Sequence, residues 1–305
     1  DIEIHMKPQR IGLCASFGLL LLYSSVSLAT TQSVVKIDSG LIRGAVDDMV
    51  KVYKGIPFAD PPVGNLRWTA PHAPRHWKGV LEAEKFPPQC SQLGPPLPTM
   101  PEEPTSEDCL YLNVWAPVRK EKMKRPVMVF FYGGGFRHGS ASTPLYATGG
   151  LPKATGVILV TINYRIGPLG FLAHPELTSG SPHHVSGNYA LLDAIAGLQW
   201  VRRNIAAFGG DPTNVTIFGQ SAGSFLVNKR MISPLADGLY QRAIAESGAD
   251  MGPTRTNEGM GVLLDAEQGG IAFAKSLGAE SIAALRKLPA ERITASEFAG
   301  LPGIY

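Results

Sequence analysis

One serine in this 305-residue chain stands in a setting that could do chemistry. Ser221 lies in the run Gly219-Gln220-Ser221-Ala222-Gly223, between a buried β-type run over 215–218 and a helical pattern over 224–232. A tight turn from a strand into a helix exposes a serine hydroxyl in a cleft, and glycines tolerate the strained, crowded backbone of such a turn. The spacing therefore predicts that Ser221 is the nucleophile of an acyl-transfer reaction.

A run of three glycines follows another predicted strand. Tyr132-Gly133-Gly134-Gly135-Phe136 comes directly after the apolar run over 127–131. Bare glycine backbone can point its N–H groups at an oxyanion, and losing one such donor costs about 100- to 1,000-fold in rate. A phosphate-binding loop is the alternative, but neither a Lys-Ser/Thr pair nor Gly-x-Gly-x-x-Gly spacing accompanies the run. We therefore predict an oxyanion loop here.

A nucleophilic serine also needs a histidine to take its proton and a carboxylate to orient that histidine. On this type of turn the order along the chain is serine, acid, histidine. No histidine follows Ser221, and seven precede it: His5, His72, His76, His138, His174, His183 and His184. His138 is expected to line the wall beside the glycine run, and the pair His183-His184 lacks a third metal ligand at suitable spacing. We expect neither a metal ion nor another cofactor.

Several strands are predicted on both sides of these motifs. Residues 34–52 alternate short β-type runs with turn residues, which predicts an antiparallel meander. Residues 127–131, 157–162 and 215–218 form continuous apolar runs typical of strands buried on both faces. A further strand is predicted over 243–246.

Helices are predicted between and after these strands. From Asn188 to Ile205, apolar residues recur every three or four positions, which predicts a helix that stops before Gly209. Residues 263–298 are predicted to be mainly helical, with breaks at Gly278 and Pro289. Alternation of strands and helices predicts a single α/β domain over residues 30–305.

The first 29 residues have the pattern of an export signal. Asp1 to His5 precede the first plausible start at Met6, basic residues then precede an apolar stretch of about a dozen residues, and small residues follow near Ala29. The stretch is too short for a membrane span. The net charge of +3 is scattered, so we expect no nucleic-acid partner and no stable membrane anchor. The sequence predicts a secreted or periplasmic protein.

Removing that signal leaves two of the three cysteines, Cys90 and Cys109. In an oxidising compartment, two cysteines suggest one disulfide, which would stabilise the fold by roughly 3 kcal/mol. Two separate buried thiols are the alternative.

With these motifs in place, the chain resembles the type-B carboxylesterase family of α/β-hydrolases from about residue 34 to the last residue. The resemblance rests on ordered motifs along the chain: Gly55-Ile56-Pro57-Phe58, Pro61-Pro62, Leu66-Arg67, the run from Ser106 to Asn113, Tyr132 to Phe136, Asn163-Tyr164-Arg165, Gly187-Asn188 and Gly219 to Gly223. It implies an α/β-hydrolase fold with a mostly parallel central sheet flanked by helices and an N-terminal antiparallel meander.

The same resemblance assigns roles to particular residues. Ser221 would be the nucleophile, and Gly134, Gly135 and Ala222 would form the oxyanion hole. Cys90 would pair with Cys109, and the two would bound a loop at the rim of the active site. Glu107 and Arg67 resemble the family's buried, structural charge pair. Gln220, Tyr132 and Phe136 are the residues predicted for the substrate pocket.

Two features bear on the substrate. The segment 91–108 has no aromatic residue, which disfavours a quaternary ammonium, and Gln220 is neutral where choline-ester hydrolases often carry an acid. We therefore expect a neutral, small-molecule carboxylic ester.

The family's acid and histidine come from a C-terminal portion, so we expect the chain to be truncated before the last strands of the sheet and to be inactive alone. Two other functions fit the same fold: an inert adhesion or binding module, and a lipase for longer acyl chains.

Overall fold

The computed structural model describes residues 33–92, 103–118, 123–248 and 262–296. The chain divides into two units, Asp1–Thr30 and Thr31–Tyr305, and every described residue belongs to the second. The predicted signal sequence therefore lies outside the described residues. No helix among those residues is long and apolar enough to cross a membrane.

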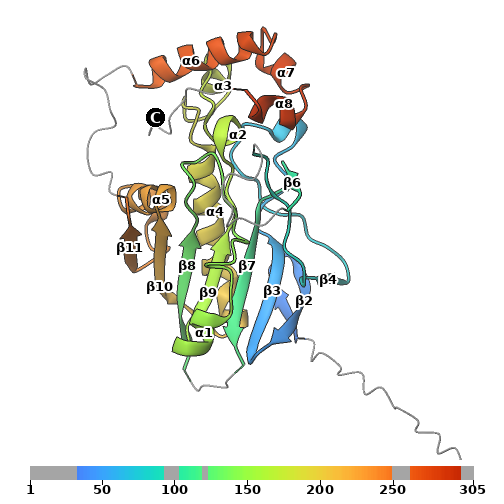
Figure 1. Ribbon diagram of the computed structural model, residues 1–305, viewed down its shortest axis with the longest axis vertical. Coiled ribbons are helices and arrows are strands. Elements are labelled where there is room, and N and C mark those ends of the chain that lie inside the picture. Colours follow the sequence, from blue (N-terminus) through green and yellow to red (C-terminus); the bar gives the residue numbers. More distant parts are fainter. Residues whose placement is uncertain (1–32, 93–102, 119–122, 249–261, 297–305) are drawn as a thin grey trace, which may run out of the picture. The chain divides into compact units, whose positions relative to one another are not determined.

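A mixed sheet of nine strands runs through the described part of the chain in the order β1-β2-β3-β7-β9-β8-β10-β11, with β4 added beside β2 (Figure 1). The strands of this sheet are β1 (Ser33–Ile37), β2 (Gly40–Asp47), β3 (Val50–Pro57), β4 (Val80–Glu82), β7 (Tyr111–Pro117), β8 (Arg125–Phe131), β9 (Ile158–Ile162), β10 (Gly210–Gln220) and β11 (Arg242–Glu246). A separate pair is formed by β5 (Gln89–Cys90) and β6 (Thr105–Ser106).

The sheet changes direction between β7 and β9. The predicted meander is confirmed, because β1, β2 and β3 pair in antiparallel register, and β7 continues this pattern against β3 and β9. From β9 through β8 and β10 to β11 every pairing is parallel. In this parallel half, strands β9, β8, β10 and β11 therefore all have their carboxyl ends at the same edge of the sheet.

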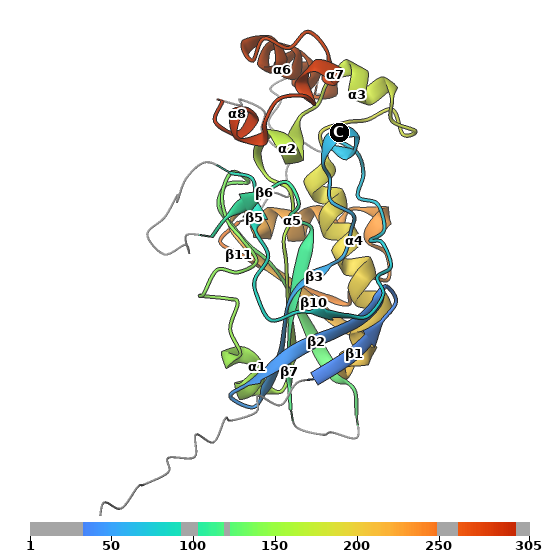
Figure 2. The same ribbon diagram turned by 90° about the vertical axis from the view of Figure 1, so that its right-hand side faces the viewer.

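Helices connect and cover these strands. The longer ones are α4 (Tyr189–Asn204), α5 (Ala222–Met231) and α6 (Val262–Ser276), and the short ones are α1 (Gly150–Thr155), α2 (Gly167–Phe171), α3 (Pro175–Ser179), α7 (Ile282–Leu285) and α8 (Ala290–Thr294). Three 3-10 turns complete the described elements: η1 (Gly64–Leu66), η2 (Ile205–Phe208) and η3 (Pro234–Ala236). Figure 2 shows α4 running along one face of the strands.

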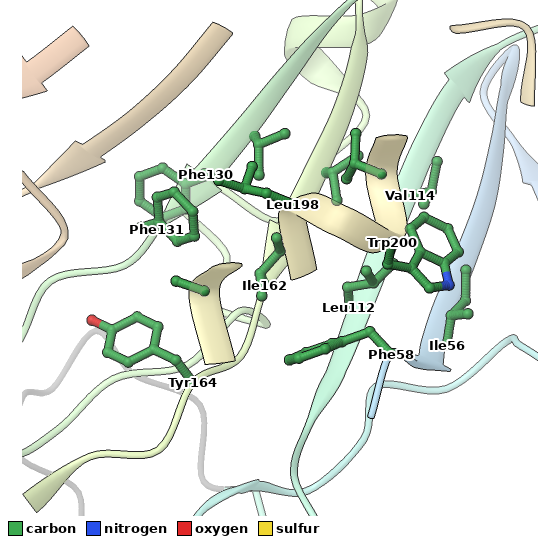
Figure 3. Close-up of a cluster of buried hydrophobic side chains, with 14 of the residues drawn as sticks. Ile56, Phe58, Leu112, Val114, Phe130, Phe131, Ile162, Tyr164, Leu198 and Trp200 are labelled. Atoms are coloured by element: carbon green, nitrogen blue, oxygen red, sulfur yellow. The ribbon is translucent and has the colours of Figure 1, made fainter. Parts of the chain in front are cut away.

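The main core lies between α4 and the sheet. Figure 3 shows Leu198 and Trp200 of α4 among side chains from the central strands, including Leu112 and Ile162. These residues are almost fully buried. Gly197 allows the close approach, because a Cβ at that position would lie 2.7 Å from Ile162 Cδ1. A second apolar cluster joins α6, α7 and α8 to Trp68 and to residues of α2 and α3.

Candidate active site

The predicted nucleophile and the glycine run meet at one edge of the sheet. Strands β8 and β10 are adjacent and parallel, and Phe131 pairs with Gly219 in their register. Because parallel strands end at the same edge, the residues that follow each strand emerge side by side. A Cβ placed on Gly133 would lie 3.2 Å from Ser221 Cβ. The structure therefore brings together two motifs that are almost ninety residues apart in sequence.

Ser221 occupies a strained turn. Its backbone dihedrals are φ 53° and ψ −119°, a region that residues other than glycine rarely adopt. Its N–H donates to Glu246 O at 2.9 Å, and its carbonyl accepts from Phe225 N at 3.1 Å. The flanking glycines are required sterically, because a Cβ on Gly219 would lie 2.5 Å from the backbone of Gly223. This is the geometry of a strand-to-helix elbow that presents a serine.

The glycine run has the backbone shape of a donor loop. Gly134 and Gly135 both have positive φ, 114° and 62°, which glycine adopts without a Cβ penalty. The Gly134 carbonyl accepts from the N–H groups of Arg137 and His138, both at 3.1 Å, which closes the loop. Within the described residues, no hydrogen bond is donated by the N–H of Gly134, Gly135 or Ala222. All three predicted oxyanion-hole donors are therefore unused by the fold.

Two stacked tyrosines hold the base of this loop. The rings of Tyr132 and Tyr164 lie 4.1 Å apart, the Tyr132 hydroxyl donates to Tyr164 O at 2.8 Å, and the Tyr164 hydroxyl donates to Tyr132 O at 2.6 Å. Burial raises the pKa of both hydroxyls, which keeps them protonated as donors. Gly167 N adds a bond to Phe136 O at 2.6 Å. The segment after β9 thus fixes the glycine loop.

A buried ion pair extends this support to α4. Arg165 donates from Nε to Asp193 Oδ2 at 2.8 Å and from Nη2 to Oδ1 at 2.7 Å, and its backbone N–H donates to Oδ2 at 3.0 Å. The side chains are 4% and 0% exposed, so the two charges satisfy each other away from water. The sequence motif Asn163-Tyr164-Arg165 pointed to this segment, but nothing in the sequence singled out Asp193 as its partner.

The three residues predicted for the substrate pocket lie in different environments. Tyr132 is buried and occupied by its contacts with Tyr164. Phe136 is 9% exposed, and its ring lies 5.1 Å from the ring of Phe171. Gln220 is half-buried, and its side-chain Oε1 would lie 2.7 Å from a Cβ on Gly133. Gln220 and Phe136 therefore flank the glycine loop, whereas Tyr132 lies beneath it.

The disulfide and the charge pair are both present. Cys90 and Cys109 are joined, with their Cα atoms 5.0 Å apart. Arg67 donates from Nε and Nη2 to Glu107 at 2.6 and 2.5 Å, and from Nη1 to Leu288 O at 2.9 Å. The pair therefore ties the segment beside the disulfide to the helices near the end of the described chain. Most of the intervening loop, residues 93–102, lies outside the described residues.

Some groups required for hydrolysis are not seen at Ser221. In the four described ranges, no histidine makes a hydrogen bond with the Ser221 hydroxyl. The same residues contain no group of three or more histidine, cysteine, aspartate or glutamate side chains that could hold a metal ion. A cavity of 780 Å³ is lined by residues of α3, α4, α5 and α7, but Ser221 and the glycine loop do not line it.

A serine elbow beside a glycine loop, at the carboxyl edge of a mixed sheet with helices, defines an α/β-hydrolase. The chain matches the model of the carboxylesterase family over residues 31–302. This chain belongs to the carboxylesterase family.

Individual relatives agree with that assignment. Fumonisin B1 esterase from Sphingopyxis macrogoltabida is 44% identical over 256 residues, which cover 84% of this chain and 45% of that protein. Para-nitrobenzyl esterase from Bacillus subtilis (strain 168) is 44% identical over 229 residues, which cover 74% of this chain and 45% of that protein. The chain thus spans about half the length of the curated relatives it matches.

Solved structures show the same similarity in three dimensions. A PNB esterase aligns with a TM-score of 0.75 and 41% identity, over 87% of this chain and 53% of that one. A thermophylic PNB esterase aligns with a TM-score of 0.77 and 40% identity, again over 87% of this chain and 53% of that one.

Proposed function

We propose that the protein hydrolyses carboxylic esters through an acyl-enzyme on Ser221. The observation that carries this proposal is the strained elbow at Ser221 beside the glycine loop, with the N–H groups of Gly134, Gly135 and Ala222 unused within the described residues. A serine held this way can attack an acyl carbon, and the donors can stabilise the negative charge that develops on the carbonyl oxygen. Membership of the carboxylesterase family supports the same reaction.

The proposed reaction has two halves. The Ser221 oxygen forms a bond to the acyl carbon while a general base takes the hydroxyl proton, and collapse of the tetrahedral intermediate expels the alcohol, which receives that proton. Water then attacks the acyl-enzyme and releases the acid in the same way. Gly134, Gly135 and Ala222 would hold the oxyanion in both halves. The base and its orienting carboxylate are further requirements that the described residues do not bring to Ser221.

We propose a small, neutral ester as the substrate. Gln220 places an uncharged side chain beside the nucleophile, and it packs against Gly133. The names of the two curated relatives describe esterases that act on fumonisin B1 and on para-nitrobenzyl esters, and an uncharged alcohol such as p-nitrobenzyl alcohol suits this setting. If turnover rises steeply from acetyl to palmitoyl esters, the protein is a lipase and this part of the proposal is wrong.

The test is hydrolysis of p-nitrophenyl acetate by the protein translated from its complete coding sequence. We expect Ser221→Ala to lower kcat/KM by at least about a thousandfold, since the nucleophile is lost and binding groups remain. Ser179→Ala is the matched control, because Ser179 is exposed at the end of α3 and takes no part in the site. Wild-type turnover in Ser221→Ala would exclude Ser221 as the nucleophile.

We also propose that the protein is exported and loses residues 1–29. The disulfide between Cys90 and Cys109 supports this, because such bonds persist in oxidising compartments. Mass spectrometry of protein recovered outside the cytoplasm should give a mature chain that begins near Thr30. Cytoplasmic protein that retains the whole N-terminus would contradict the proposal.

A further inference from the structure

A buried arginine near the end of α5 lacks hydrogen-bond partners. Arg230 is 2% exposed, and within the described residues its Nε and Nη2 atoms have no partner. Burial lowers its pKa to about 10, against an opposing effect of Tyr240 and Asp193, so the side chain is a cation at neutral pH. The Asp193 carboxylate is already bonded to Arg165. A buried guanidinium left in this state is costly unless an anion joins it.

The unused edge of Arg230 has a defined preference. Nε and Nη2 form one side of the guanidinium, which binds a carboxylate through two parallel hydrogen bonds. Two other buried arginines show this use: Arg67 gives the same two atoms to Glu107, and Arg165 gives them to Asp193. In Arg230 the same two atoms have no partner within the described residues and are covered from solvent, so the guanidinium must turn toward the cavity to use this edge. A carboxylate is therefore the group that would complete it.

Arg230 lines the cavity of 780 Å³ between α3, α4, α5 and α7. Its volume lies within the range of about 300 to 1,000 Å³ that is common for small-molecule sites. Leu191, Leu192 and Ile195 of α4 form an apolar wall. At the rim, Ile232 is 66% exposed and Leu235 is 61% exposed. The cavity thus combines a cation at one point with a long apolar surface.

The other charged side chains that line the cavity are more often positive than negative. Lys229 and Arg286 also line it, against the single carboxylate of Glu176. Glu176 accepts from Ile282 N at 3.1 Å, and Arg286 donates to the carbonyl of Arg67 at 3.0 and 3.1 Å. Positive charge therefore exceeds negative charge around the space.

We propose that this cavity binds an amphiphilic carboxylate of the fatty-acid class, with the carboxylate on Arg230 and the alkyl chain along the apolar wall of α4. A neutral ester or alcohol would fill the apolar part and leave the guanidinium unpaired. The site is separate from the reacting centre, because Ser221 immediately precedes α5 and Arg230 lies nine residues further along the chain, about 13.5 Å away along the helix axis. The proposal does not depend on ester hydrolysis.

The experiment measures binding by isothermal titration calorimetry in the Ser221→Ala background, so that catalysis plays no part. The probes are decanoate and 1-decanol, which share a chain and differ in charge. We expect decanoate to bind at least about tenfold more tightly than decanol, because hydrogen bonds between charged partners raise binding affinity by at least about tenfold. Equal affinities, or no binding of decanoate at millimolar concentration, would overturn the proposal.

Two variants test the two halves of the site. Arg230→Met should weaken decanoate binding at least about tenfold and leave decanol binding unchanged. Methionine is chosen because folds tolerate the replacement of a buried charge by an apolar side chain of similar size. Leu192→Trp should fill the cavity and abolish binding of both probes with Arg230 intact. Arg75→Met is the matched control, since that side chain is 87% exposed and lies outside the cavity.

Unchanged decanoate binding in Arg230→Met or in Leu192→Trp would show that the ligand sits elsewhere. If Arg230→Met fails to fold by circular dichroism, the decanol comparison and Leu192→Trp decide the question.

Discussion

Replacing Gly223 by alanine tests how closely the nucleophile helix approaches the sheet. Gly223 is the second residue of α5. A Cβ there would lie 2.7 Å from the Phe131 carbonyl carbon and 2.8 Å from Tyr132 O, and closer still to Phe131 O. All three are backbone atoms, so no side-chain rotation can relieve the overlap. The methyl group must push the start of α5 away from the end of β8.

The expected loss of stability follows from two opposing effects. Overpacking of this kind costs about 3 kcal/mol, at the upper end of the usual range because only backbone can move. Alanine in place of glycine returns at most about 1 kcal/mol through helix propensity. We therefore expect Gly223→Ala to lower the free energy of unfolding by about 2 kcal/mol and Tm by roughly 4 °C.

A second glycine in a helix provides the control. Gly269 lies within α6, is exposed, and a Cβ there would have no atom within 4 Å. Gly269→Ala should therefore raise the free energy of unfolding by up to about 1 kcal/mol, through propensity alone. The same substitution thus has opposite signs at the two positions.

The assay is urea unfolding followed by far-UV circular dichroism, with the free energy obtained by linear extrapolation. Gly223→Ala should also lower kcat/KM for p-nitrophenyl acetate, because the shift of α5 moves Ser221 relative to the glycine loop. If Gly223→Ala unfolds at the same urea concentration as wild type, or at a higher one, the close approach of α5 and β8 is wrong.

Three further outcomes are expected. Arg67→Met should lower the free energy of unfolding by about 3 kcal/mol in urea, because it leaves the largely buried Glu107 carboxylate unpaired; stability equal to wild type would contradict this. Reduction of the Cys90–Cys109 disulfide by dithiothreitol should lower the free energy of unfolding by roughly 3 kcal/mol. Dithiothreitol should have no such effect on a variant in which serine replaces both cysteines. Burial lowers the pKa of His174, and its Nδ1 accepts a hydrogen bond from the backbone N–H of Glu176. Below about pH 6.5, the unfolded chain therefore binds a proton at this histidine that the folded chain does not bind. Stability should therefore fall as pH drops below 6.5, and His174→Asn should flatten that fall in urea titrations at several pH values.

Local patterns predicted the elements that carry the site. The elbow at Ser221 and the loop after β8 could be recognised because glycine is needed where φ is positive or where backbone segments touch. The buried strands β8 and β9 are continuous apolar runs, and they lie within two residues of their predicted bounds. The helix after Asn188 was predicted from its apolar stripe, and α4 ends at Asn204, one residue before the last apolar residue of that stripe, Ile205.

Other features depend on contacts between distant segments and leave no local signal. The sequence predicted a strand from Val215, but β10 begins at Gly210, because Gly210 pairs with Arg125 across an irregularity in the register. Asp193 reads as one polar position on a helix, and only the fold reveals that it neutralises Arg165. The unpaired edge of Arg230 is equally invisible in the sequence.

Trapping the acyl-enzyme is the most direct test of the proposed mechanism. The full-length protein would be mixed rapidly with p-nitrophenyl acetate, quenched in acid, digested and mapped by mass spectrometry. The mechanism predicts one acetyl group on the peptide that contains Ser221, and none in the Ser221→Ala variant. Steady hydrolysis with the acetyl group on another residue would contradict the assignment of Ser221 as the nucleophile.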